Sequence, residues 1–318
     1  MTMVCPSPAA QDSQAGQASG YEHSACPVCQ ETQGQKLFRE VSEGVEVSVI
    51  LCEGCGLGYS NPRPSEAHKL QRYKQWANLE RPWQAEAHYD HRQQLRHFDL
   101  YRRVMQLIQA RHGSGSILDI GCGGGMFLIF AGVFASEHNA GINSRYRVEG
   151  AAFDPQEAAL SRQISGVTVH SIADLAHLPA GRFEAITLLN VLEHVNQPLD
   201  LLRQSHRLLK PGGVLVLVVP NNSMAFWRLR RRIRKPPASL AAGEHINHFR
   251  PASLRKALRR CGFARVRFAP DVLVGDYGSM APLPPAQWIK YGIYRALDAL
   301  SFSRCYLYAD LLVVADRD

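Results

Sequence analysis

The chain has 318 residues, of which 46% are hydrophobic and 20% charged, a balance typical of a globular protein with one large and one smaller domain. No apolar run reaches the ~20 residues of a membrane-spanning helix. The first residues lack a basic stretch followed by an apolar one, so we expect no signal peptide and a cytoplasmic protein. The net charge of +8 favours an anionic partner.

Two CxxC pairs dominate the N-terminal part of the chain. Residues 1–22 are rich in small and polar residues without periodicity, which predicts a disordered tail. Residues 23–62 carry the pairs, which are Cys26 with Cys29 and Cys52 with Cys55. Four thiolates complete a tetrahedron around Zn²⁺ and leave no open coordination position. We therefore predict a zinc ribbon whose ion is structural; a redox dithiol is the alternative.

Helical and strand-like segments follow in order. Residues 63–112 have apolar residues at helical spacing and predict a helical cap or linker, which could cover a ligand. From residue 113 strands and helices alternate, which predicts a doubly wound, mostly parallel α/β sheet, a Rossmann-like domain over 113–318. Seven strands are expected. The first ends at Asp119, and the other six span residues 148–153, 167–170, 183–189, 214–219, 263–274 and 306–315.

A glycine-rich turn and three strand-end acids fall where such a sheet binds ligands. Gly121–Gly125 follow the first strand, where the lack of a Cβ lets the backbone approach a ligand closely. Asp119, Asp154 and Asp174 fall at the ends of the first three strands. A carboxylate there can accept hydrogen bonds from ribose hydroxyls or from an adenine amine. The alternative is that these aspartates only cap helices.

The glycine loop and the strand-end acids occur along the chain in the order found in a known enzyme family. Together with Leu189–His194 and Leu209–Gly213, they follow the order seen in class I S-adenosylmethionine-dependent methyltransferases, which the chain resembles over residues 24–275. It is similar to the branch with an N-terminal CxxC…CxxC ribbon and a late His-x-x-His-Phe segment, here His245–Phe249. The resemblance implies S-adenosylmethionine as the methyl donor, bound by Asp119, Gly121, Cys122, Gly123, Asp154, Pro155, Asp174, Leu175, Asn190 and Glu193.

One spacing departs from the usual pattern. Asp154 lies 33 residues after Gly121, whereas the ribose acid usually follows its glycine loop by about 20 residues. We therefore expect an inserted surface loop over residues 134–147, and Glu149 is the rival ribose acid. A Rossmann dehydrogenase is the competing fold, but it lacks the Leu-Glu-His and Lys-Pro-Gly-Gly elements.

The methyl acceptor is expected beyond the fourth strand. His194 is the leading candidate base, and a structural role beneath the cofactor is its alternative. Residues 221–250 predict a lid, in which Trp227–Lys235 carries six positive charges beside the site. Arg228 and Arg231, with Glu244, are predicted substrate contacts, and His245 and His248 are further catalytic candidates.

The sequence therefore predicts methyl transfer, at oxygen, to a small or carrier-linked anionic metabolite such as a sugar, a polysaccharide precursor or a secondary metabolite. One alternative is an RNA methyltransferase that grips nucleic acid with the ribbon and the Arg-rich lid. The few basic or aromatic residues of the ribbon count against it. A second alternative is an inactive methyltransferase-like binding protein, and the intact Asp119, Gly121 and Asp154 count against that.

Overall fold

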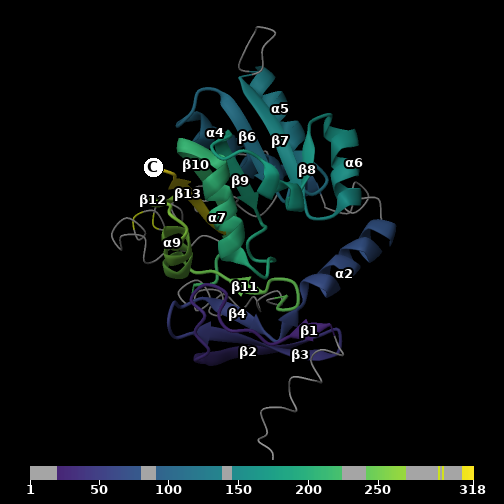
Figure 1. Cartoon of the computed structure of the whole chain (residues 1–318), viewed down its shortest axis with the longest axis vertical. Helices are drawn as coiled ribbons and strands as arrows, with labels where there is room; N and C mark the ends of the chain where they lie inside the picture. Colours follow the sequence, from purple (N-terminus) through teal and green to yellow (C-terminus); the bar gives the residue numbers. More distant parts are fainter. Residues whose placement is uncertain are drawn as a thin grey trace, which may run out of the picture.

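The computed structural model describes residues 20–79, 91–137, 145–223, 241–269, 293, 296 and 310–318. These residues form two parts that pack against each other (Figure 1). A large sheet flanked by helices occupies the upper part of the view, and a small antiparallel sheet, drawn mostly in purple, lies below it.

The large sheet is the doubly wound sheet that the sequence predicts. Its seven strands lie in the order β12-β13-β10-β9-β6-β7-β8. The pairs from β10 to β8 are parallel, and β13 is antiparallel to both β10 and β12. The chain moves from β6 to β7 on one side and later to β9 on the other, so the switch point lies at the carboxyl end of β6. The strands are β6 (Gly115–Ile120), β7 (Tyr146–Ala152), β8 (Val169–Ser171), β9 (Phe183–Leu189), β10 (Leu209–Pro220), β12 (Arg265–Ala269) and β13 (Asp310–Asp316).

Alternating side chains of these strands build one core on each face. Ile117 and Val216 pack with α4 (His91–Gln109), α5 (Met126–Glu137) and α6 (Pro155–Ser165). Leu118 and Leu217 point the other way, toward α7 (Pro198–Leu208) and α9 (Pro251–Arg260). Successive residues of a strand face opposite sides, so a strand covered on both faces is apolar throughout, as β10 is.

The small sheet contains a strand that the sequence analysis did not predict. Its order is β11-β4-β3-β2, with β2 (Gly34–Ser42), β3 (Val45–Cys52), β4 (Gly58–Asn61) and β11 (Asn247–His248). β11 belongs to the segment predicted as a lid, yet it pairs antiparallel with β4 of the ribbon. Ribbon residues Cys26, Val28 and Leu57 share one apolar core with Leu254 and Leu258 of α9. The ribbon is therefore joined to the large domain by packing and by backbone hydrogen bonds.

Several predicted boundaries differ from the structure. The predicted disordered tail is too long at its end, because Tyr21–Glu22 forms strand β1, which pairs with β5 (Arg63–Pro64). The helical region divides into α2 (Glu66–Leu79) and α4, and residues 80–90 lie outside the described residues. Lys210–Gly213, which the sequence predicts as the turn that ends the preceding helix, is part of β10, where the pairing register shifts between Leu209 and Val214.

Two predicted features fall largely on residues that the structure does not describe. Residues 138–144 of the expected insertion lie outside the described residues, between the end of α5 and the start of β7. The same holds for residues 224–240, with Arg228 and Arg231 of the Arg-rich run. No helix in the described part of the chain is both long and apolar enough to cross a membrane.

Candidate functional site

The four ribbon cysteines converge at one point. Cys26 Sγ lies 3.5 Å from Cys55 Sγ, Cys29 Sγ lies 3.3 Å from Cys52 Sγ, and all four sulfurs lie within 4.8 Å of one another. Two sulfurs on a tetrahedral zinc ion, with bonds of about 2.3 Å, are about 3.8 Å apart. The donor set therefore fits structural zinc, which these four thiolates would hold.

Each cysteine pair sits on a tight turn that local residues make possible. Gln30 follows the first pair with φ of 64°, and Gly56 follows the second with φ of 75°. Backbone N–H groups of these two residues donate to the carbonyls of Cys26 and Cys52. Each turn thus aims two sulfurs at the same point.

The glycine-rich turn lies at the switch point of the large sheet. Gly121 has φ of 77°, and a Cβ built there would lie 2.4 Å from Cγ2 of Val191. Gly125 has φ of 84°, and its Cβ would lie 2.7 Å from Oγ of Ser161. Both positions require glycine, for backbone conformation and for space. The loop therefore presents bare backbone to the space beyond β6.

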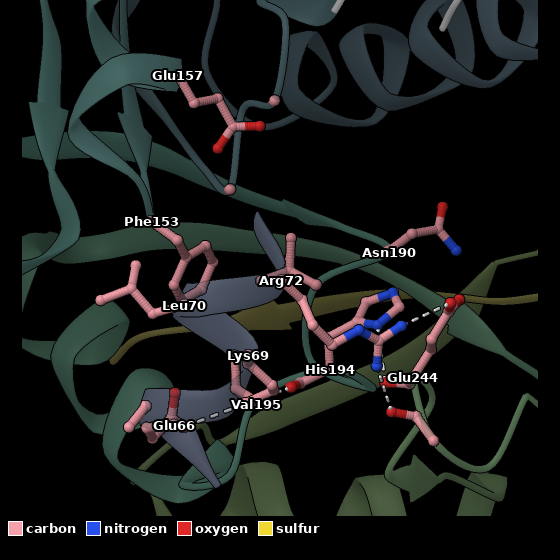
Figure 2. A pocket seen from close by; sticks show the side chains of 15 residues that line it. Glu66, Lys69, Leu70, Arg72, Phe153, Glu157, Asn190, His194, Val195 and Glu244 are labelled. Atoms are coloured by element: carbon pink, nitrogen blue, oxygen red, sulfur yellow. Dashed lines mark hydrogen bonds and ion pairs between the residues drawn. The ribbon is translucent and has the colours of Figure 1, made fainter. Parts of the chain in front are cut away.

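That space is a cavity of about 760 Å³, a size that suits a cofactor with a small second ligand. Figure 2 shows Glu157 and Phe153 on one side of the cavity, and Lys69, Arg72, His194 and Glu244 on the other. Gly121 and Gly123 come from the loop after β6, and His194 comes from the turn after β9. The lining residues are Glu66, Ala67, Lys69, Leu70, Arg72, Gly121, Gly123, Phe153, Glu157, Asn190, Val191, His194, Val195, Gly243 and Glu244.

Asp154, the predicted ribose acid, caps a helix. Its Oδ1 accepts hydrogen bonds from the backbone N–H groups of Gln156 and Glu157, 2.8 Å and 3.1 Å away, at the start of α6. The residue is 3% exposed and does not line the cavity. Its Oδ2 has no hydrogen-bond partner within the described structure.

Glu157, in the first turn of α6, does line the cavity, and the sequence analysis missed it. Burial, and then the nearby charge of Asp154, raise the pKa of Glu157 to about 7. A carboxyl beside the glycine loop with a pKa near neutrality is typical of a ligand site. The sequence signal was its place in the first turn of the helix that follows the strand-end acid.

Other predicted cofactor residues lie around the cavity without lining it. Asp119 is buried beneath the glycine loop, where Thr187 Oγ1 donates to its Oδ1 at 2.6 Å and burial raises its pKa to about 7. Asp174 lies in η2 (Ile172–His177), is exposed and accepts a hydrogen bond from the N–H of Ser171, the N-cap residue of η2. Cys122, Pro155 and Leu175 are also absent from the lining, whereas Gly121, Gly123 and Asn190 are part of it.

Glu149, the rival ribose acid, is engaged elsewhere. It lies within β7, where Arg182 Nη2 donates to both of its oxygens and His170 Nε2 lies 2.8 Å from Oε2. Burial raises its pKa, but these partners outweigh that effect and lower it overall. Its carboxylate is thus satisfied within the sheet and does not line the cavity.

His194 and His245 form a pair at the far side of the cavity. Their ring centroids are 4.7 Å apart, at an interplanar angle of 73°. His194 Nδ1 lies 3.0 Å from the carbonyl oxygen of Glu244, which can only accept, so we assign the proton to Nδ1 and leave Nε2 with a free lone pair. Burial, and then His245, lower the pKa of His194 to about 4, which keeps the ring neutral at pH 7.

The two other predicted polar residues of this region are more deeply placed. Glu193 is 1% exposed and lies beneath the turn, where Asn190 Nδ2 donates to its Oε1 at 3.3 Å and burial raises its pKa to about 8. His248 is buried in β11, and its Nε2 lies 3.4 Å from Ser60 Oγ. Neither side chain lines the cavity.

Helix α2, within the predicted helical cap, supplies a wall of the cavity, although the sequence analysis named none of its residues as site residues. Lys69 Nζ donates to the carbonyl oxygen of His194 at 2.9 Å and to Glu66 Oε1 at 3.2 Å. Arg72 pairs with Glu244 at 3.2 Å and with Glu43 of the ribbon at 3.1 Å. The predicted helical cap thus does reach the cavity, and both of its described cations there are paired with carboxylates.

Comparison with known proteins agrees with this architecture. A family model described as a methyltransferase domain matches residues 87–267, more than half of the chain. The chain therefore belongs to this family, and its sheet is that of the class I, S-adenosylmethionine-dependent methyltransferases.

The curated relatives match a shorter stretch. A ubiquinone biosynthesis O-methyltransferase of Xanthomonas axonopodis pv. citri is 34% identical over 154 residues, which is 46% of this chain and 61% of that protein. The protein of the same name from Xanthomonas campestris pv. campestris is 34% identical over 113 residues, 36% of this chain and 46% of that one. The chain thus spans less than two thirds of the length of these relatives. A solved methyltransferase of Archaeoglobus fulgidus is 17% identical, with a TM-score of 0.43 over 68% of this chain and 92% of that one.

Proposed function

We propose that the protein transfers a methyl group from S-adenosylmethionine to an oxygen atom of a small or carrier-linked metabolite. The observation that carries this proposal is that Gly121, Gly123 and His194 line one cavity. The donor would lie over the glycine loop and the acceptor beside the histidine pair. The family supports the reaction class, and the names of the relatives, which are O-methyltransferases, support oxygen as the acceptor atom.

S-adenosylmethionine, when bound, supplies an activated methyl group and leaves as a neutral thioether. The chain has to orient the acceptor and remove its proton. We assign the proton transfer to His194, whose Nε2 takes the hydroxyl proton as the acceptor oxygen bonds to the methyl carbon. His245, against the same ring, and Glu244, whose carbonyl holds Nδ1, fix the imidazole in its accepting tautomer.

The packing of the ribbon favours a metabolite over RNA. Its zinc knuckles contact α9, where Lys256 Nζ donates to the Gly54 carbonyl oxygen at 2.6 Å, so this end of the ribbon faces its own protein. Because Lys69 and Arg72 are already paired, we assign recognition of an anionic acceptor to Arg228 and Arg231, which lie outside the described residues.

The direct test uses tritiated S-adenosylmethionine. Purified protein should transfer label to a component of a small-molecule extract, and the label should resist the mild base that cleaves methyl esters, as an ether methyl does. Bulk tRNA, assayed in parallel at low and high salt, should remain unlabelled. Labelled tRNA would overturn the metabolite assignment. Failure to bind the donor in calorimetry would overturn methyl transfer itself.

We further propose that Glu157 provides the carboxylate for the donor ribose. Replacing Glu157 by glutamine should weaken binding of S-adenosylhomocysteine about 10- to 100-fold, since a hydrogen bond to a charged group contributes about 1.5–3 kcal/mol. The pKa of about 7 adds a pH signature. Below pH 7 the carboxyl must lose a proton on binding, so affinity should fall by up to about tenfold per pH unit, and it should level off above pH 7. Calorimetry between pH 5.5 and 8.5 measures both effects.

The matched control is Asp154→Asn. Asparagine caps a helix as well as aspartate does, so this variant removes the charge and keeps α6. We expect its affinity to stay within about threefold of wild type, the size of a few tenths of a kcal/mol, because Asp154 does not line the cavity and its Oδ1 caps α6. The unpaired Oδ2 of Asp154 makes that carboxylate the competing assignment. A larger loss in Asp154→Asn than in Glu157→Gln would return the ribose contact to Asp154.

A further inference from the structure

The turn that carries His194 is held between two groups of residues from the ribbon side. Residues 190–196 follow β9 and form the floor of the cavity near the histidine pair. On one side Asn196 Nδ2 donates to the Pro64 carbonyl at 3.0 Å, and Arg63 Nη1 donates to the Asn196 carbonyl at 2.8 Å. Pro64 and Arg63 form β5, directly after the ribbon. One end of the turn is therefore fixed to the ribbon.

Asn247 holds the middle of the same turn. Its Nδ2 donates to the carbonyl oxygens of Leu192 and Val195, at 3.0 Å and 2.7 Å. These two residues flank Glu193 and His194, and the backbone N–H of Asn247 donates to the Glu193 carbonyl at 3.0 Å. The side chain is 1% exposed, so water cannot replace these bonds. A single buried amide thus closes the turn around His194.

The backbone of Asn247 belongs to the ribbon sheet. It pairs with Tyr59 in the antiparallel β11–β4 ladder, and the Ser60 N–H donates to the Ile246 carbonyl at 2.9 Å. β4 begins three residues after Cys55. His245, the partner ring of His194, lies two residues before Asn247 on the same segment. Asn247 therefore fixes the positions of both histidines relative to the zinc ribbon.

We propose that Asn247 is a positioning residue for the proton-transfer pair, through which the ribbon sets the geometry of His194 and His245. This inference rests on the proposed function. It assigns the ribbon a role in the chemical step, separate from binding of the donor. Among the described residues, the hydrogen bonds of Asn247 go to Leu192, Glu193, Val195 and the β4 strand, and none of them reaches the glycine loop. Loss of the Asn247 amide should therefore lower the turnover number and leave the affinity for the donor unchanged.

The test compares Asn247→Ala with Ser205→Ala. Ser205 is also fully buried and donates one side-chain hydrogen bond, to the Leu201 carbonyl at 2.8 Å, but it lies in α7 away from the cavity. Both variants should lose thermal stability. Only Asn247→Ala should lose kcat, by about 10- to 100-fold, because small displacements of reacting groups have effects of this size. Its affinity for S-adenosylhomocysteine should stay within about twofold, and its zinc content should be unchanged.

A second readout does not need turnover. Hydrogen exchange of the peptide 191–196 should accelerate in Asn247→Ala and not in Ser205→Ala. Equal kcat losses in the two variants, or unchanged exchange of this peptide, would overturn the positioning role. If wild type binds the donor but labels no acceptor, the proposed function fails while the exchange result still decides the role of Asn247.

Discussion

Cys52→Ser is expected to abolish zinc binding and to cause the largest loss of stability among the variants considered. Cys52 is 1% exposed and is one of the four converging thiolates. Structural zinc sites contribute about 10–16 kcal/mol of apparent binding free energy in small zinc-binding peptides. Because the ribbon shares a core with α9, its unfolding should also expose apolar surface of the large domain. Elemental analysis and calorimetric unfolding measure the two effects.

The matched control for this substitution is Cys261→Ser. Cys261 is similarly buried, and its Sγ lies 3.5 Å from the Leu199 carbonyl rather than near another sulfur. We expect about one zinc per chain in wild type and in Cys261→Ser, and none in Cys52→Ser. Equal zinc content in the two variants would contradict the four-cysteine site.

His194→Ala should lower kcat/KM by about 10²- to 10⁴-fold, the usual contribution of a general base. The ring lines the cavity and is neutral at pH 7, and its unprotonated Nε2 lies 3.9 Å from Glu193 Oε1. His245→Ala should have a smaller effect, since that ring supports the first. The double variant should lose little more than His194→Ala, because residues that act as a unit are not additive. Steady-state kinetics with the identified acceptor measures all three.

Two controls accompany these histidine variants. His206→Ala removes a ring that packs against Phe263 at the end of α7, and should leave kcat/KM unchanged. Glu193, His194 and His245 also place one ligand atom each within 4.8 Å of one another, which a divalent metal ion could use. We expect turnover to be unaffected by a chelator that leaves the ribbon zinc in place. Loss of turnover, restored by added metal, would replace the base by a metal ion.

His248 was a catalytic candidate on sequence grounds, and its placement leads to a different expectation. The ring is fully enclosed beside Ser60, and burial lowers its pKa to about 3. A side chain of this kind contributes to packing, so His248→Ala should reduce thermal stability without the selective loss of kcat expected for His194→Ala.

The sequence predicted those features that neighbouring residues decide. Each CxxC pair contains its own turn, and the spacing of the four cysteines names the ligand set. Gly121 and Gly125 occupy positions where φ is positive and a Cβ would collide with Val191 or Ser161, so the glycine loop could be read directly. The apolar run of β10 likewise predicts a central strand, because both of its faces are covered.

The sequence could not decide those features that depend on which distant segments pack together. The sequence pattern of a strand-end aspartate is the same whether its carboxylate binds a ribose or caps a helix. The structure shows that the Asp154 carboxylate points toward the N–H groups at the start of α6. Glu157, and not Asp154, lines the cavity. The helical spacing of residues 63–112 predicted a cap, but it did not say which residues of α2 line the cavity.

The sequence by itself thus determined the two CxxC pairs, the glycine loop and the doubly wound, mostly parallel class of the sheet, because backbone conformation and side-chain periodicity are local. Tertiary structure alone decided that Asn247, almost 190 residues after Tyr59, completes the ribbon sheet and closes the turn around His194. Strand β11 has only two residues, which is too short for a periodic pattern that could be recognised in the sequence. Their pairing is fixed by the shared core of the ribbon and α9 and by backbone groups that must be satisfied when buried.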